Sequence, residues 1–138
     1  MNPPLRTQDD VDAIIEGLRD GTIDAIATDH APHHEDEKER EFDLAPNGII
    51  GFETALPLAV SMLYKTGKMS LSEILACMTY KPSDILQLSK GDLRVGGAAD
   101  IVMFDPERSF VVKRDEIASK AKNTPFIDTE LYLSLIHI

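Results

Sequence analysis

The sequence contains a single cysteine, Cys77, and no tryptophan. One cysteine excludes an internal disulfide framework and is typical of a reducing compartment, so the cysteine count favours the cytoplasm. No stretch approaches the roughly 18 consecutive apolar residues of a membrane-spanning helix. The first ten residues, MNPPLRTQDD, also lack the apolar core of a signal peptide. The sequence therefore predicts no membrane partner.

Basic residues are scarce as well. There are 14 Lys and Arg against 24 Asp and Glu, which gives a formal net charge of −10 at pH 7. Nucleic acids and anionic membranes require clustered Lys and Arg, so the charge excludes both as partners. Six acids gather within residues 34–43, a density that indicates a solvated loop or helix face. The apolar fraction of 43% nevertheless allows a hydrophobic core, and 138 residues correspond to about one small domain.

The first regular pattern predicts a helix followed by a strand. Thr7 is suited to an N-cap position, and Gly21 to a C-terminal stop. One helix face is apolar and consists of Val11, Ile14, Ile15 and Leu18. The next segment, TIDAIAT at 22–28, is mostly apolar and predicts a strand buried on both sides. Together these elements form the αβ half of a parallel α/β repeat.

The remainder changes character near Lys90. Before it we expect a long loop over 30–48, a helix kinked at Pro57, a helix with a Ser70–Glu73 capping box, and a short helix over KPSDILQL. After it the chain is β-rich, with a β run over 101–104 and a turn at Asp105–Pro106. We therefore divide the chain into residues 1–90 and 91–132.

Two features indicate an incomplete chain. A lone αβ unit has no closed sheet, so its buried strand would lack neighbours. The last six residues, LSLIHI, match the peptide that a widely used transposase sequencing adapter encodes in one reading frame. We expect residues 133–138 to be an adapter-derived tail that is not native to the protein.

Candidate chemistry centres on ATDHAPHHED, residues 27–36. Asp29 ends the predicted strand, where residues of an α/β barrel line the active site. It could ligate a metal and carry a proton, or it could simply cap the following turn. His30, His33 and His34 lack the i, i+4 spacing of two ligands on one helix, and Pro32 excludes a regular helix through them. This spacing disfavours a histidine metal site, although imidazole can also bind a substrate carboxylate.

Two turn-like segments are weaker candidates for binding. Asn2 and Arg6 flank a rigid Pro3–Pro4 pair, which suits a positioned binding amide. The APNG segment that ends in Asn47 and Gly48 could bring backbone N–H groups close to a ligand, because glycine permits close approach. An ordinary turn explains APNG equally well.

Taken together, several motifs resemble the C-terminal portion of the dihydroorotase family, in the cyclic-amide branch of the amidohydrolase superfamily. The resemblance rests on their order and spacing from residue 1 to about 126. TDHAPH and NPPLR are the most specific, whereas GDLRVGGAADIVMFD is a general amidohydrolase signature. The motifs are MNPPLR, IDAIATDHAPH, LAPNGIIGFETALPL, KPSDILQL, GDLRVGGAADIVMFD and KNTPF.

The resemblance implies an α/β fold: the C-terminal part of a (β/α)8 TIM barrel over residues 1–90, and part of a small β-sandwich over 91–132. It implies the zinc-dependent, reversible cyclisation of N-carbamoyl-L-aspartate to dihydroorotate in pyrimidine biosynthesis. Asp29 would be a ligand of one or two zinc ions and would carry the proton between metal-bound hydroxide and the ring nitrogen. Asn2, His33, Asn47 and Gly48 match substrate-binding positions, although many relatives have Phe in place of Asn47. His30 and His34 match no ligand position.

The family's His-x-His motif, its bridging acid or carboxylated lysine, and two later metal histidines do not occur in this sequence. One carboxylate cannot hold a catalytic zinc, which needs about three protein ligands. We therefore expect the chain alone to be inactive. Two alternatives stay open: a hydantoinase or allantoinase, and a non-catalytic dihydroorotase-like subunit that partners aspartate transcarbamoylase. The full-length protein could also form a homodimer.

Overall fold

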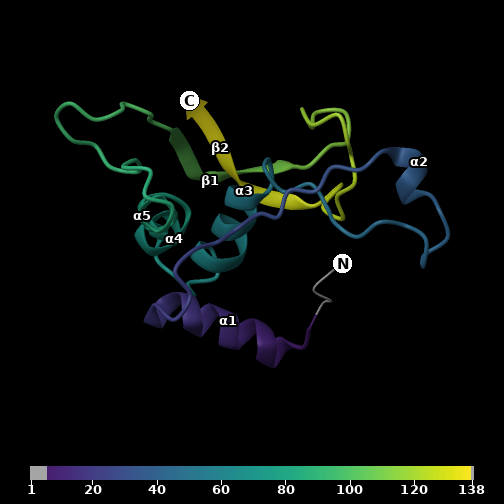
Figure 1. Ribbon diagram of the computed structural model, residues 1–138, viewed down its shortest axis with the longest axis horizontal. Coiled ribbons are helices and arrows are strands. Elements are labelled where there is room, and N and C mark those ends of the chain that lie inside the picture. The colour runs from purple at the N-terminus through teal and green to yellow at the C-terminus, as the bar shows by residue number, and fades with distance from the viewer. Residues whose placement is uncertain (1–5, 138) are drawn as a thin grey trace.

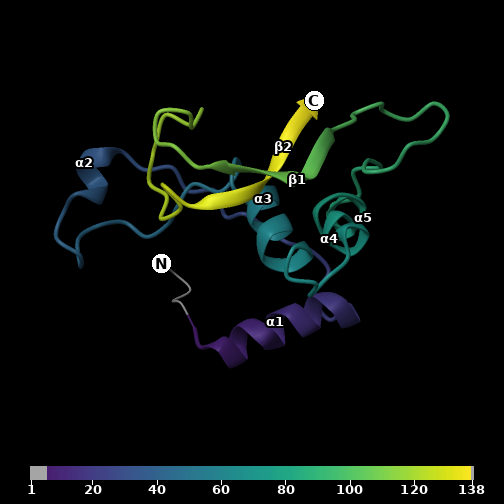
Figure 2. The ribbon, with the colours of Figure 1, turned by 180° about the vertical axis from the view of Figure 1, so that it is seen from behind.

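The structure is a computed structural model that describes residues 6–137. Its helices α3 and α4 lie between helix α1 and a two-stranded sheet, whereas α2 lies apart at one end (Figure 1). The view from behind shows the same order (Figure 2). The elements are α1 (Gln8–Asp20), α2 (Glu35–Lys38), α3 (Ala55–Ala59), the π-helix η1 (Val60–Tyr64), α4 (Leu71–Met78), α5 (Tyr80–Ile85), β1 (Met103–Val111) and β2 (Glu130–His137).

Helix α1 begins and ends where its sequence signals predicted. The Asp10 carboxylate accepts hydrogen bonds from the Thr7 backbone N–H at 3.0 Å and from the Thr7 hydroxyl at 2.8 Å. These bonds lower the pKa of Asp10 and fix the first turn. At the other end, Gly21 adopts the left-handed conformation with φ of 84°, which closes the helix at low steric cost.

The helical segment after Gly51 accommodates Pro57 without a break. Helix α3 begins at Ala55, so Pro57 lies in the first turn, where a missing N–H costs little. The π-helix η1 follows directly and takes the place of the predicted kink. The Ser61 hydroxyl donates to the Pro57 carbonyl at 2.7 Å and accepts from the Tyr132 N–H at 2.8 Å, which links η1 to β2.

Strands β1 and β2 pair antiparallel. The turn that we predicted at Asp105–Pro106 is wrong, because β1 continues through both residues. Pairing is instead irregular between Asp105 and Ser109, as expected for a strand that contains a proline without an N–H donor. Strand β2 continues to His137 and buries Leu133, so it includes most of the predicted non-native tail. The origin of that tail stays a prediction.

The segment Thr22–Thr28 differs from the strand that we predicted. It is extended but pairs with no strand among residues 6–137. Its Ile26 N–H instead donates to the Cys77 carbonyl of α4 at 3.0 Å. A barrel strand needs a neighbour on each side, and the described residues provide none, so an apolar sequence alone does not produce a hydrogen-bonded strand here.

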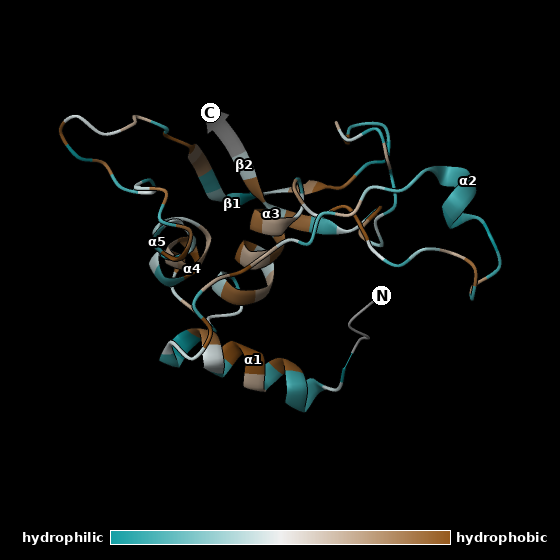
Figure 3. Cartoon of the chain, viewed as in Figure 1, coloured by the Kyte–Doolittle hydropathy of each residue, from teal (hydrophilic) through white to brown (hydrophobic). Residues whose placement is uncertain are grey.

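Two hydrophobic clusters hold the described residues together. The first joins α1, η1 and α4 around Leu18, Ile74 and Cys77. The second packs Ile50 against Leu131 and residues that follow β1, so it crosses the predicted boundary near residue 90. The apolar side of α1 faces the other helices (Figure 3). Within residues 6–137, no helix is long and apolar enough to cross a membrane.

Candidate functional site

The candidate site forms where two loops run side by side. Asp29 ends the extended segment with a positive φ of 44°, a conformation that Asp tolerates better than most residues. Directly after it, His30 forms a parallel bridge with Ile49, and the Ala31 N–H donates to the Ile49 carbonyl at 2.9 Å. The segment that follows the predicted strand therefore lies against the segment that contains Asn47 and Gly48.

Gly48 makes this close approach possible. Its φ is +109°, and an added Cβ would lie 2.6 Å from the Ala31 Cβ. The same Cβ would lie 3.4 Å from His33 Nε2, so the imidazole of His33 stands beside the Gly48 backbone. Two predicted substrate-binding residues thus come together in space.

His33 is held on its backbone side and along one edge of its ring. Its N–H donates to the Asn123 side-chain oxygen at 3.3 Å, and its Nδ1 lies 3.6 Å from a Glu37 carboxylate oxygen. The side chain is 26% exposed, so it remains accessible. The imidazole can therefore reach a ligand while a Glu37 carboxylate oxygen lies near its Nδ1.

Of the other two predicted substrate residues, the structure describes only Asn47. Asn47 is exposed and lies next to Gly48 in the loop. The Lys38 ammonium fixes this loop from behind by donating to the carbonyls of Pro46 at 2.8 Å and Gly48 at 3.2 Å. Asn2 lies outside the described residues.

His30 and His34 serve the backbone. His30 Nδ1 accepts from the Gly51 N–H at 3.1 Å, and its ring stacks on Phe52 with centroids 4.0 Å apart. His34 Nδ1 accepts from the Asp36 N–H at 3.3 Å, which caps α2. Each Nδ1 lone pair accepts a hydrogen bond from the backbone. That neither histidine is a metal ligand stays a prediction.

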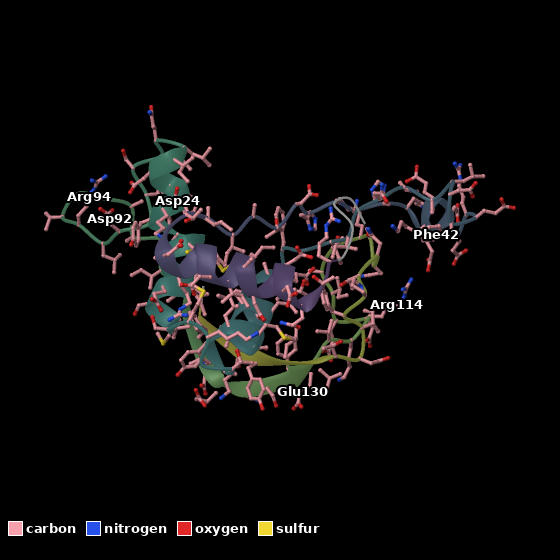
Figure 4. The ribbon with its side chains drawn as sticks, turned by 90° about the horizontal axis from the view of Figure 1, so that it is seen from below. Asp24, Phe42, Asp92, Arg94, Arg114 and Glu130 are labelled. Atoms are coloured by element: carbon pink, nitrogen blue, oxygen red, sulfur yellow. The ribbon has the colours of Figure 1, made fainter. Side chains whose placement is uncertain are left out.

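Beyond the candidate site, the loop that contains α2 carries the acidic run out into solvent. Phe42 is 99% exposed at its tip, and Figure 4 shows it projecting away from the body of the molecule.

Closer to the site, Arg114 pairs with Glu35. A cavity of about 210 Å³ lies beneath the loop; its lining residues are His33, Glu35, Lys38, Glu39, Arg114, Lys122 and Asn123.

Sequence analysis missed one residue of this site. Asn123, from the KNTPF motif, contacts both loops through its side chain. In the sequence, Asn123 was notable only as a residue of the KNTPF motif. That motif does not indicate a contact with His33. The pairing depends on the fold, since 90 positions separate the two residues.

The described residues supply too few convergent donors for a metal site. Among residues 6–137, no three His, Cys, Asp or Glu side chains converge in a way that could hold a metal ion. Asp29 can supply one carboxylate ligand, but a catalytic zinc needs about three from the protein. The described residues therefore do not form a metal site by themselves.

Comparison with solved structures defines the class of protein. An L-hydantoinase (dihydropyrimidinase) from Arthrobacter aurescens matches 97% of the chain with a TM-score of 0.89 and 29% identity. A dihydropyrimidinase from Brevibacillus agri matches 97% with a TM-score of 0.89 and 27% identity. The chain spans 31% and 30% of these two structures. The fold is that of part of a (β/α)8-barrel hydrolase, which confirms the predicted fold class.

The chain belongs to the amidohydrolase family, whose model matches residues 2–130. Members of this family usually bind a metal. A dihydroorotase from Ruminiclostridium cellulolyticum is 56% identical over 132 residues, and one from Acetivibrio thermocellus is 51% identical over 141 residues. These matches cover 96% and 99% of the chain but only 31% and 33% of the relatives, so the chain spans about a third of their length.

Proposed function

We propose that the full-length protein of which this chain is a part is a dihydroorotase. It would catalyse the reversible cyclisation of N-carbamoyl-L-aspartate to (S)-dihydroorotate in pyrimidine biosynthesis. One observation carries the proposal: identity to the two dihydroorotases is 51–56% over nearly the whole chain. Identity to the two solved hydantoinase-type structures is 27–29%, so that alternative fits less well.

The proposal assigns a role to each candidate residue. Asp29 carries the proton to and from the ring nitrogen through a carboxylate oxygen. His33 neutralises the substrate carboxylate, and Asn2, Asn47 and the Gly48 backbone complete the binding surface. The contact of the loop after Asp29 with the Gly48 loop supports this assignment, since it brings His33 beside Gly48.

We further infer that the full-length protein binds one or two zinc ions and that Asp29 is one ligand. The remaining ligands would come from parts of the protein outside this chain, because the described residues supply no complete set. Bound zinc supplies a Lewis acid and a nucleophile at neutral pH. The chain alone should therefore show no turnover.

Other expectations for the full-length protein rest on the same family assignment. Residues 1–90 would belong to the barrel, 91–132 to the β-sandwich, and 133–138 to a non-native tail. The enzyme would be cytoplasmic and act on a small-molecule substrate, with a homodimer or an aspartate transcarbamoylase complex as possible assemblies. A non-catalytic partner subunit is a second candidate, although the presence of Asp29 counts against the loss of ligands that such a subunit would show.

A chimera tests the choice of substrate. The upstream two thirds of the Ruminiclostridium cellulolyticum dihydroorotase would be joined to residues 1–132 of this chain, and zinc-loaded enzyme assayed with dihydroorotate and with hydantoin. We expect kcat/KM for dihydroorotate to exceed that for hydantoin by at least about 100-fold. A chimera that prefers hydantoin would show the proposed substrate to be wrong.

A further inference from the structure

Asn123 joins the two loops of the candidate site. Its side-chain nitrogen donates to the Ala31 carbonyl at 2.9 Å and to the Gly48 carbonyl at 3.3 Å. Its side-chain oxygen accepts from the His33 N–H at 3.3 Å. Only a side chain with both donors and an acceptor, as in a primary amide, can make all these bonds at once.

The backbone of Asn123 strengthens the same junction. Its carbonyl accepts from the Ile50 N–H at 3.1 Å, and Ile50 is buried in the second hydrophobic cluster. The backbone that carries the side-chain amide is therefore hydrogen-bonded to a residue of the second hydrophobic cluster. Such support is what holds a binding group within about 0.5 Å of its productive geometry.

We propose that Asn123 is a positioning residue that fixes His33 relative to the Gly48 backbone at the substrate site. The proposal rests on the proposed function, because it assumes that these two residues bind the substrate. In this role Asn123 acts through His33 and Gly48 and not on the substrate itself. Its loss would leave His33 and Gly48 present but misplaced, and substrate binding should weaken as a result.

Glu53 provides a matched control. Its carboxylate accepts from the N–H groups of Ala118 at 2.8 Å and Ser119 at 3.0 Å. It therefore ties the segment that leads to Asn123 to the turn before α3, yet none of its described hydrogen bonds involves His33 or Gly48. Glu53→Ala removes a tether of similar kind without touching the proposed contacts.

Amide hydrogen exchange on the full chain tests the geometry directly. In Asn123→Ala, the His33 and Ala31 amides should exchange about tenfold faster, while the Ile74 amide of α4 stays protected. Asn123→Asp keeps the acceptor for His33 but loses the donors to the Ala31 and Gly48 carbonyls. The two loops should then separate, so the Ala31 amide, which donates to the Ile49 carbonyl across them, should exchange faster while the His33 amide stays protected. Glu53→Ala should change neither amide by more than about twofold.

Several results would overturn the inference. They are an unprotected His33 amide in the unsubstituted chain, unchanged exchange in Asn123→Ala, or the same pattern in Glu53→Ala as in Asn123→Ala. If the Ile74 amide also exchanges faster in Asn123→Ala, that variant has lost its fold. The Asn123→Asp variant then tests the inference, through the difference in exchange rate between the His33 and Ala31 amides.

The chimera tests the consequence for substrate binding. Asn123→Ala should raise the KM for dihydroorotate about tenfold and leave kcat within about threefold. The reason is that His33 and Gly48 would bind the substrate equally well in the ground state and in the transition state. An unchanged KM would contradict the positioning role. If the unsubstituted chimera shows no turnover of dihydroorotate, the proposed function is wrong. The hydrogen-exchange experiment still tests the positioning by Asn123, because it does not require activity.

Discussion

At the scale of single residues, Gly48 has little freedom to change. It combines a φ of +109° with a Cβ position only 2.6 Å from the Ala31 Cβ. The positive φ disfavours any residue with a side chain, and the close approach disfavours even a methyl group. Gly67 also has a positive φ, of +69°, but its Cβ would meet no atom within 4 Å. The steric overlap with Ala31 is therefore particular to Gly48 in this pair.

Gly48→Ala should therefore cost more stability than Gly67→Ala. Both substitutions introduce left-handed strain, but only the first forces the Gly48 loop away from Ala31. We expect its free energy of unfolding to fall by about 1–3 kcal/mol more than that of Gly67→Ala. Urea unfolding followed by circular dichroism measures the difference. Equal losses would mean that the two loops move apart without cost and are not held as the structure describes.

Residues of the site differ in how far the sequence could predict them. Asp29 and Gly48 carry local signals, a carboxylate after an apolar run and a glycine in a turn, so a role for each could be proposed in advance. Asn123 carries none, because its partners are 75 to 92 positions away and only the fold brings them together. The hydrogen bonds of His30 and His34 to the backbone could not be predicted either, because the spacing of the histidines bears only on metal ligation.

At the scale of elements, the capping box of α4 is the clearest case of local control. The Glu73 carboxylate accepts from both the hydroxyl and the N–H of Ser70 at 2.7 Å, and the Ser70 hydroxyl accepts from the Glu73 N–H at 3.3 Å. The hydrogen bond from the Ser70 hydroxyl, with that from the backbone, lowers the pKa of Glu73 from its ordinary value of 4.5. An acid whose pKa is lowered by folding stabilises the fold at pH values above its ordinary pKa. This stabilisation is lost as the pH falls through the lowered pKa.

Ser70→Ala should lower the free energy of unfolding by about 1 kcal/mol at pH 7. The difference from the unsubstituted chain should stay full above about pH 5 and shrink as pH falls through the lowered pKa of Glu73. Urea unfolding between pH 7 and pH 3 measures both effects. Ser72→Ala is the control, because Ser72 is exposed in the same first turn. A loss that does not depend on pH would refute the coupling to Glu73.

Elements also show where sequence prediction stops. The boundaries of α1 and the start of α4 follow from caps and apolar spacing, which are local. Helix α5 covers Tyr80–Ile85, whereas the predicted helix covered KPSDILQL, and its N-cap residue makes no side-chain hydrogen bond. The segment Thr22–Thr28 has the composition of a buried strand, but strand pairing requires neighbours that residues 6–137 do not provide. The irregular pairing of β1 at Asp105 likewise depends on its partner β2, which begins far along the chain.

At the scale of the whole molecule, a mostly apolar groove lies beside α1. Val11 and Ile14 are 41% and 54% exposed along it, and the buried Thr54 hydroxyl has no hydrogen-bond partner among residues 6–137. The chain spans about a third of the length of its dihydroorotase relatives. We expect the remaining part of such a protein to cover this groove, since exposed apolar faces of this kind mark interaction surfaces.

The central claim is that this chain contributes the proton-carrying aspartate of a dihydroorotase. Asp29→Asn in the zinc-loaded chimera tests it most directly, because the amide keeps the shape but cannot carry a proton. Asp24→Asn is the control, since Asp24 is exposed in the same extended segment (Figure 4). We predict that Asp29→Asn lowers kcat for dihydroorotate by about 10²–10⁴-fold, and that Asp24→Asn leaves kcat within about twofold. A kcat for Asp29→Asn within about threefold of the unsubstituted chimera would contradict the account.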